Sequence, residues 1–384
     1  MTDNTRVLQV IQAPQRRGAE VFAVQLSVAL RGLTCPATVV SLFPGDDAFA
    51  SQATEAGVWG GSLGARRPRG PLSWPLVRAL GRRIAAAGNP VVQANGSATL
   101  KYLAIARLIA RGRWPLVYRT IGMPSYWRRD ALRMTTYRWL FGQADIVVAV
   151  CRRAAEDLQE QIGIPSHRVR VIPNGVDAQP FVSRPAATRN RVRTQAGVRS
   201  DDVVLIHVGS LSAEKNHGAL IRTAAAMRDA GQPIRLWLVG EGPEREAIRG
   251  MIDRAGLQPL VWLTGTRNDV PELLAAADVL VLPSLTEGMP AAVIEAGLSG
   301  LPVVAYRVGG IDEVVRHEHT GLLVAAGDEA GLRASLTRLA ADQTLRESMG
   351  AAARTACQAY EIHQVAAQYA DVYAGLRNGQ RPHV

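Results

Sequence analysis

Two carboxylates flank the expected start of a helix in residues 283–296 of this 384-residue chain. An apolar run, residues 279–282, comes directly before this segment and is typical of a buried strand. The segment therefore falls at the carboxyl end of a strand, where open parallel α/β sheets bind ligands. Glu287 lies in the expected loop and Glu295 in the expected helix. Pro290 suits the first helical position, because its missing N–H would have no partner there.

The first turn of this helix is suited to binding an anion. Its backbone N–H groups, including those of Met289, Ala291 and Ala292, lack intrahelical partners, and the helix dipole adds partial positive charge. A phosphate at this position suits a nucleotide sugar, with Glu295 on the ribose hydroxyls and Glu287 on the sugar hydroxyls. A capped helix with two solvated glutamates fits the local pattern about equally well.

A rare lysine occupies the equivalent place after another strand. Lys215 follows the apolar run 203–208 and precedes a helical pattern, and Lys101 is the only other lysine in this arginine-rich chain. A lysine at this edge could neutralise a diphosphate leaving group, an effect worth roughly 3 kcal/mol of barrier. The alternative is a surface lysine that the helix dipole slightly disfavours. We favour the first interpretation.

Three further loops come directly after expected strands. Residues 15–20 contain one glycine, Gly18, so they are not the G-x-G-x-x-G dinucleotide fingerprint. Residues 240–243 and 265–268 could each be an ordinary turn. Taken with the loops of Lys215 and Glu287, they are expected to line one edge of a sheet.

The elements that must position these loops alternate short β-branched runs with longer amphipathic segments, which is typical of parallel α/β proteins. The expected strands are residues 6–11, 37–42, 90–94, 116–119, 145–150 and 169–172, then 203–208, 234–239, 260–263, 279–282, 302–305 and 322–324. Residues 180–197 show little apolar periodicity and are interpreted as an interdomain linker. We therefore expect an N-terminal domain over 1–178, a C-terminal domain over 179–357, and a helix over about 358–384 that packs back on the first domain.

Several motifs in order make the chain resemble glycosyltransferase family 4, also described as glycosyl transferases group 1. They are Val171-Ile172-Pro173-Asn174-Gly175-Val176-Asp177, Val208-Gly209 with Glu214-Lys215, Leu238-Val239-Gly240-Glu241-Gly242-Pro243, Pro283-Ser284 with Glu287-Gly288 and Glu295-Ala296, and Gly300-Leu301-Pro302-Val303-Val304. The resemblance implies the GT-B fold, two doubly wound Rossmann-like domains facing across a cleft. It also implies retaining transfer without a metal or other cofactor.

The resemblance assigns roles by position. Lys215 would bind the donor diphosphate, Glu287 the transferred sugar and Glu295 the ribose, with Lys215 and Glu287 as the catalytic pair. The other positions expected at the donor are Gly18, Gly209, Ser210, Thr266, Arg267, Gly288, Met289, Pro290, Ala291 and Ala292.

Two positions depart from the family pattern. Ser210 stands where the family usually has arginine, and Asn95 stands where it often has histidine. We expect Arg17, Arg119 or Arg307 to supply the missing charge, and we take Arg17, Asn95 and Arg119 as acceptor-side candidates.

The charge of the N-terminal half is strongly positive. Residues 61–139 hold fifteen Arg or Lys against one acid, including Arg66, Arg67 and Arg69 and the expected helix 74–88. Such an excess predicts an anionic partner, for which we favour a membrane surface met by an interfacial helix. A phosphorylated or acidic soluble acceptor and an arginine-rich solvated face are the alternatives. No apolar run reaches the ~20 residues that cross a bilayer, and no secretory signal is evident. We therefore expect a cytoplasmic protein, peripheral at the inner face of the membrane.

Together these observations predict a glycosyltransferase that moves a sugar from a UDP- or GDP-linked donor to a hydroxyl of a glycan, lipid or small-molecule acceptor. Bacterial polysaccharide or glycoconjugate biosynthesis is the expected setting. Two alternatives stay open: a noncatalytic sugar-nucleotide-binding protein, and another GT-B enzyme such as a sugar-nucleotide epimerase. Nucleic-acid binding is not expected, because no recognised module appears.

Overall fold

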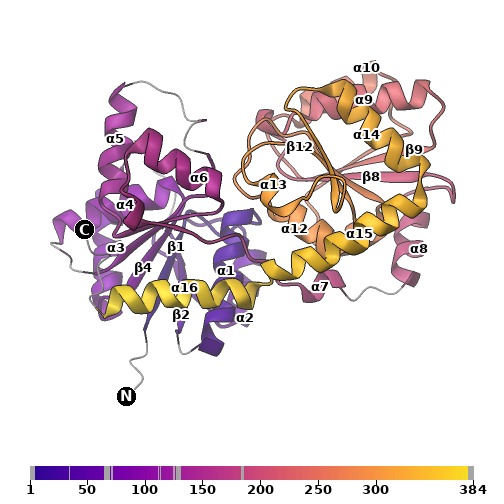
Figure 1. The fold of residues 1–384 in the computed structure, drawn as a ribbon. Coiled ribbons are helices and arrows are strands. Elements are labelled where there is room, and N and C mark those ends of the chain that lie inside the picture. Colours follow the sequence, from indigo (N-terminus) through magenta and orange to yellow (C-terminus); the bar gives the residue numbers. More distant parts are fainter. Residues whose placement is uncertain are drawn as a thin grey trace. The chain divides into compact units, whose positions relative to one another are not determined.

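The computed structural model of the chain describes residues 5–33, 35–64, 70, 72–110, 112, 114–123, 126, 131–182 and 186–378. The chain divides into two compact units, Met1–Val176 with Tyr360–Val384, and Asp177–Ala359 (Figure 1). Each unit is a parallel sheet covered by helices, which confirms the expected α/β class with two Rossmann-like domains.

The first unit holds a seven-stranded sheet in the order β3-β2-β1-β4-β5-β6-β7. Its strands are β1 (Val7–Ile11), β2 (Ala37–Ser41), β3 (Trp59–Ser62), β4 (Val91–Asn95), β5 (Leu116–Arg119), β6 (Ile146–Ala149) and β7 (Val169–Val171). Its helices are α1 (Gly18–Leu30), α2 (Asp47–Glu55), α3 (Trp74–Ala86), α4 (Ser97–Ile109), α5 (Ala131–Gly142) and α6 (Arg152–Asp157). Strands β1, β4, β5 and β6 are buried throughout, because helices cover both faces of the sheet.

The last helix, α16 (Ile362–Arg377), belongs to the first unit and packs beside α1 (Figure 1). It contributes the buried side chains Ile362, Val365, Ala366, Tyr369 and Tyr373 to the core under β1 and β4. The hydroxyl of Tyr373 also accepts a hydrogen bond from Gln9 Nε2 at 3.1 Å. Apolar and polar contacts thus both hold α16 against this sheet.

The second unit holds a six-stranded sheet in the order β10-β9-β8-β11-β12-β13. Its strands are β8 (Val203–Val208), β9 (Ile234–Val239), β10 (Val261–Gly265), β11 (Val279–Leu282), β12 (Val303–Tyr306) and β13 (Gly321–Val324). Its helices are α7 (Gln179–Val182), α8 (Ala186–Gln195), α9 (His217–Asp229), α10 (Arg245–Arg254), α11 (Val270–Ala276), α12 (Ala291–Leu298), α13 (Ile311–Val314), α14 (Glu329–Ala341) and α15 (Gln343–Cys357). Buried side chains of α9, α10 and α14 form one core with the sheet, while α8 packs on α11 and α12 on α15.

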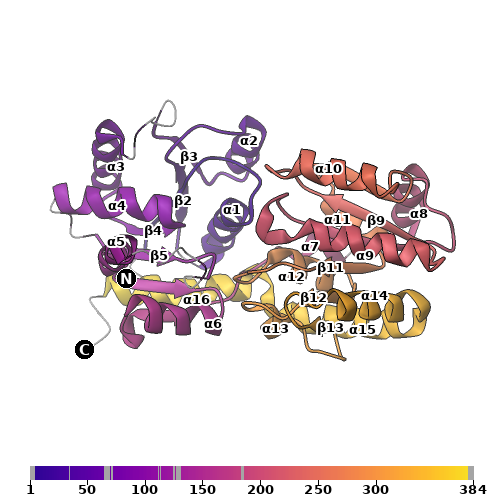
Figure 2. The same ribbon diagram turned by 90° about the horizontal axis from the view of Figure 1, so that it is seen from above.

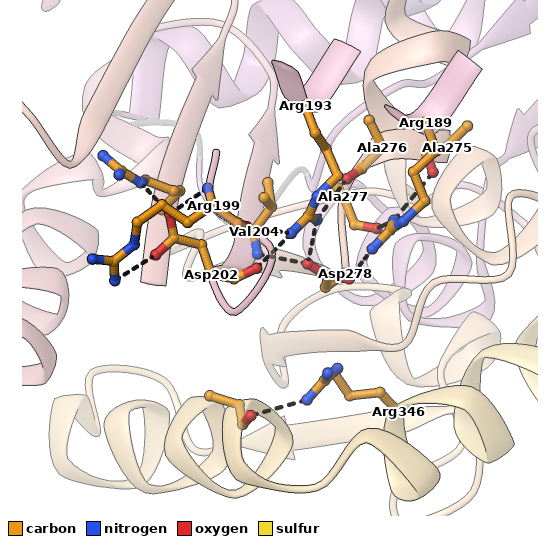
Figure 3. A network of polar contacts seen from close by, with 12 residues as sticks. Arg189, Arg193, Arg199, Asp202, Val204, Ala275, Ala276, Ala277, Asp278 and Arg346 are labelled. Atoms are coloured by element: carbon orange, nitrogen blue, oxygen red, sulfur yellow. Dashed lines mark hydrogen bonds and ion pairs between the residues drawn. The ribbon is translucent and has the colours of Figure 1, made fainter. Parts of the chain in front are cut away.

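The interdomain linker expected over 180–197 is wrong, because most of this segment forms α7 and α8 within the second unit. Arginines replace the apolar stripe that a packed helix usually shows. Arg189 Nη2 and Arg193 Nη1 bind the two oxygens of Asp278 at 2.5 and 3.0 Å, just before β11 (Figure 3). Each arginine also donates to backbone carbonyls at the end of α11, namely those of Ala275, Ala276 and Ala277. Charge-assisted hydrogen bonds thus attach α8 to the amino end of the strands.

The interfacial helix expected in the basic segment is also corrected. Helix α3 lies beside α4 (Figure 2), and its apolar side chains Val77, Leu80 and Ile84 are buried in the first unit. They are therefore not available to a bilayer. Its exposed face carries Trp74, Arg78 and Arg82, while Arg66, Arg67 and Arg69 lie outside the described residues. Among the described helices, none has both the length and the apolar character that crossing a membrane requires.

Candidate functional site

The second unit has its topological switch point between β8 and β11. The chain runs outward from β8 through β9 to β10 and then returns to β11 on the other side of β8. Parallel sheets bind ligands at the carboxyl ends of strands beside such a point. The loops that follow β8 and β11 are the ones that carry Lys215 and Glu287, and the loop after β10 carries Thr266 and Arg267.

Lys215 and Glu287 form an ion pair at this point. The Nζ of Lys215 lies 2.6 Å from Oε1 of Glu287, and the two side chains are 16% and 8% exposed. A short, charge-assisted hydrogen bond between groups so little exposed holds both side chains in one orientation. The two residues that the sequence assigns to the diphosphate and to the sugar are therefore in direct contact.

The loop of Glu287 is held by a second loop through backbone contacts. Gly309 adopts a φ of +57°, and a Cβ at that position would lie 1.8 Å from the carbonyl oxygen of Glu287. The N–H of Gly310 donates to the carbonyl of Gly288 at 2.7 Å. Only glycine permits this approach and this backbone conformation, so the loop after β12 fixes the backbone that presents Glu287.

Glu295 stands out by its environment. It lies in α12, is half-buried, and its carboxylate has no hydrogen-bond partner or ion pair among the described residues. Loss of solvation raises the pKa of this carboxyl from 4.5 to about 7. A carboxylate in this state costs stability unless a ligand or water satisfies it. The structure corrects one detail nearby: α12 begins at Ala291, so Pro290 precedes the helix as its N-cap residue.

The other donor candidates of the second unit lie on the same carboxyl edge. Ser210 is exposed, and its hydroxyl contacts that of Ser212 at 2.9 Å. Arg267 is committed to Asp269 through two hydrogen bonds of 2.8 and 2.6 Å, and its guanidinium lies over the Trp262 ring at 5.5 Å. Thr266 is exposed beside it. Arg307, considered as a replacement for the missing arginine, is exposed directly after β12.

The acceptor-side candidates lie in the first unit, where two of them are buried. The Asn95 amide donates to Gln9 Oε1 at 2.9 Å and accepts from Gln93 Nε2 at 3.2 Å. Arg119 is 1% exposed, stacks on a phenylalanine ring at 3.9 Å, and burial lowers the pKa of its guanidinium. These surroundings favour a role in holding the unit together over contact with an acceptor.

Arg17 and Gly18, at the start of α1, are the accessible candidates of the first unit. Both residues are exposed. Within the described part of the chain, no atom lies within 4 Å of the position that a Gly18 Cβ would occupy. A ligand can therefore approach the backbone of this turn closely.

Sequence reasoning missed two histidines beneath Lys215. The rings of His207 and His217 meet edge to face, with centroids 4.7 Å apart, and both residues are buried. Burial, with a smaller effect of Lys215, lowers the pKa of both imidazoles, that of His217 to about 4. Both rings are therefore neutral at pH 7. Their sequence positions could have identified them, because they flank the lysine motif on both sides.

These features define a protein of the doubly wound α/β class whose second unit offers a polar ligand site at its switch point. Residues 188–356 match the family described as glycosyl transferases group 1, and residues 16–180 match glycosyltransferase family 4. The chain therefore belongs to the GT-B glycosyltransferases of family 4, also described as glycosyl transferases group 1, as its motifs indicate.

Similar proteins include several glycosyltransferases. The chain is 27% identical over 232 residues to N-acetyl-alpha-D-glucosaminyl L-malate synthase of Bacillus anthracis, an alignment that covers 60% of each chain. It is 30% identical over 208 residues to 2-deoxystreptamine glucosyltransferase of Streptomyces kanamyceticus, covering 53% of this chain and 54% of the relative. The chain thus spans little more than half the length of these relatives. The solved structure of Anabaena HepE in complex with UDP-glucose has a TM-score of 0.84 at 25% identity, covering 97% of this chain and 100% of that one.

Proposed function

We propose that this chain is a glycosyltransferase that moves a sugar from a nucleotide-diphosphate sugar to an acceptor hydroxyl, with retention of configuration and without a metal. One observation carries the proposal: the Lys215–Glu287 pair and Glu295 lie around the start of α12 at the switch point. These groups suit a phosphate, a sugar and a ribose. The complex of HepE with UDP-glucose supports a UDP-linked donor over a GDP-linked one.

Each part of the donor has a matching group in this site. Phosphate oxygens accept hydrogen bonds from the Lys215 ammonium and from the backbone N–H groups at the start of α12, where the dipole favours negative charge. The ribose hydroxyls donate to the Glu295 carboxylate, which has no hydrogen-bond partner in the part of the chain that the structure describes. Hydroxyls of the transferred sugar donate to Glu287.

The proposed chemistry needs no pair of acid and base carboxylates. The bond between the anomeric carbon and the diphosphate oxygen breaks, and the acceptor oxygen bonds to that carbon on the same face. The acceptor proton passes to an oxygen of the departing phosphate. Negative charge therefore develops on the diphosphate, where Lys215 and the dipole of α12 stabilise it. The acceptor is a hydroxyl of a glycan, a lipid or a small molecule.

A panel of labelled UDP- and GDP-sugars tests this function. We expect slow hydrolysis of one donor by the protein alone and faster transfer when a suitable acceptor is added. Lys215→Met, which keeps the aliphatic stem and removes the charge, should lower both signals at least ten-fold but leave them measurable. Absence of turnover with every donor would refute the enzyme.

A noncatalytic sugar-nucleotide-binding protein is the second candidate. The observation that favours it is the low positive charge of the site: Ser210 replaces an arginine, and the charge of Lys215 is already matched by Glu287. Calorimetric binding of UDP or a UDP-sugar without turnover would support this candidate.

A further inference from the structure

The loop of Lys215 and the loop of Glu287 are joined by a row of cross-links. Backbone pairing of β8 with β11 continues to Ile206 opposite Leu280. Beyond that pair, every second residue from Val281 to Glu287 is bound by His207 near the end of β8 or by the segment that follows β8. The links are His207 Nδ1 to Val281 O at 3.0 Å, Asn216 Nδ2 to Pro283 O at 3.3 Å, Leu285 N to Glu214 O at 2.8 Å, and Lys215 Nζ to Glu287 Oε1 at 2.6 Å.

His207 makes the first of these links. The carbonyl oxygen of Val281 can only accept, so Nδ1 of His207 carries the hydrogen and donates it. The ring is 0% exposed, and its Nε2 has no hydrogen-bond partner among the residues that the structure describes. A Cβ at Gly209 would lie 3.3 Å from this Nε2 and 3.7 Å from Cε of Lys215, so ring and lysine stem flank the same glycine. His207 thus connects the end of β11 to Gly209, the glycine beside the Lys215 side chain.

Asn216 makes the second link and turns the chain into α9. Its backbone is left-handed, with φ 54° and ψ 46°, a conformation that asparagine tolerates better than most residues. This turn directs the amide toward Pro283 while the preceding residue, Lys215, reaches Glu287. A residue with both properties, tolerance of the left-handed region and a side-chain donor, is needed here.

We propose that His207 and Asn216 are positioning residues that set the distance between Lys215 and Glu287, and so align the groups for diphosphate and sugar. The assignment of these groups to diphosphate and sugar rests on the proposed function, whereas the coupling of His207 to Lys215 can be measured without it. His207 is fully buried and so acts from beneath the site. Each of the two residues acts by holding two loops in register across the switch point, and loss of either link lets the lysine and the carboxylate move apart.

Substitutions at His207 separate this role from simple packing. His207→Leu fills the space but makes no hydrogen bond to Val281. His207→Asn places an amide nitrogen where Nδ1 lies and restores the donor. We expect His207→Leu to lower kcat by roughly ten-fold or more with little change in KM, because misplacement of a catalytic group by about 1 Å can cost far more than that. His207→Asn should return kcat to within about three-fold of wild type.

A double-mutant cycle with Lys215→Met gives the decisive measurement. If His207 acts through Lys215, His207→Leu should change activity less than about two-fold when Lys215→Met is already present. Equal effects in both backgrounds would overturn the inference. Met227→Ala is the control, since it removes a buried side chain near the other end of α9, away from Lys215. It should lower the melting temperature without coupling to Lys215.

The cycle comprises four proteins: wild type, His207→Leu, Lys215→Met and the double variant. The same four proteins keep the test independent of the proposed function. If no donor turns over, the function fails, and the cycle is then measured as UDP affinity by calorimetry. Coupling between His207 and Lys215 in UDP affinity would support the positioning role. Additive effects on affinity, with all four proteins shown to be folded by thermal melting, would refute it.

Discussion

Glu295→Gln should make the free protein more stable and the nucleotide complex weaker. The carboxyl has no hydrogen-bond partner among the described residues, and desolvation raises its pKa from 4.5 to about 7. The folded state therefore binds the proton more tightly than the unfolded state does. It follows that the stability contributed by this carboxyl is fully present below pH 4.5 and is lost as pH rises through 7.

The size of this effect on folding stability follows from the size of the pKa shift of Glu295. At 1.36 kcal/mol for each pKa unit, the cost of the charged carboxylate is about 1 kcal/mol at pH 5.5 and about 3 kcal/mol at pH 8. Glutamine has nearly the same shape and does not titrate, so the variant avoids this cost. For a unit of this size, 1 kcal/mol changes the melting temperature by about 2–4 °C. Glu295→Gln should therefore melt several degrees higher at pH 8 and only slightly higher at pH 5.5.

Binding should change in the opposite direction. If Glu295 accepts hydrogen bonds from ribose, its loss weakens UDP binding by about 1–3 kcal/mol. Wild-type affinity should also rise from pH 6 to pH 8 as the carboxyl ionises, whereas that of the variant should rise less. Thermal melting across pH and calorimetry with UDP measure both effects, with Glu347→Gln on the exposed face of α15 as the control. A variant that is no more stable than wild type at pH 8 would refute the desolvation argument, and unchanged affinity would refute the ribose contact.

Three further predictions concern charge. Lys215→Ala and Glu287→Ala should each lower turnover at least ten-fold. Each single variant should also lose more than half of the folding stability that the double variant loses, because either change alone leaves a little-exposed charge unpaired. Denaturant melts of the three variants measure these losses. Turnover should survive a chelator, and its loss with recovery on adding magnesium or manganese would contradict the metal-free proposal. The exposed face of α3, with Trp74, Arg78 and Arg82, should bind anionic vesicles through charge, so sedimentation with them should vanish at high salt and in Arg78→Glu/Arg82→Glu. Protein that stays in the supernatant at low salt would contradict the membrane, and an anionic soluble acceptor or an arginine-rich solvated face would then explain this charge.

The strands of this fold could be predicted because buried parallel strands are continuous apolar runs. The bounds expected for β5, β8, β9 and β11 agree with the structure. Strand β3 was missed because it contains Gly60 and Gly61, which have no β-propensity, and because it lies half-buried at the edge of the sheet. An edge strand has one neighbour, and its sequence is correspondingly less constrained.

Helix α8 could not be predicted because its attachment is polar. Prediction from periodicity requires an apolar stripe, and α8 offers mainly arginines and small residues. Its partner Asp278 lies far along the chain, before β11 (Figure 3). A single sequence does not reveal such a pairing, so an anchored helix is indistinguishable from a charged linker.

The candidate site shows the same limit at the level of side chains. Sequence motifs placed Lys215 and Glu287 at strand ends, but not in contact with each other. Their pairing changes the chemistry, since a phosphate alone would have to compete with the carboxylate for the ammonium. A complete nucleotide sugar brings both phosphate oxygens for Lys215 and hydroxyl donors for Glu287, so it can satisfy both partners when it separates them. On the proposed function, the ion pair therefore favours the intact donor over the free nucleoside diphosphate, because only the donor compensates both charges.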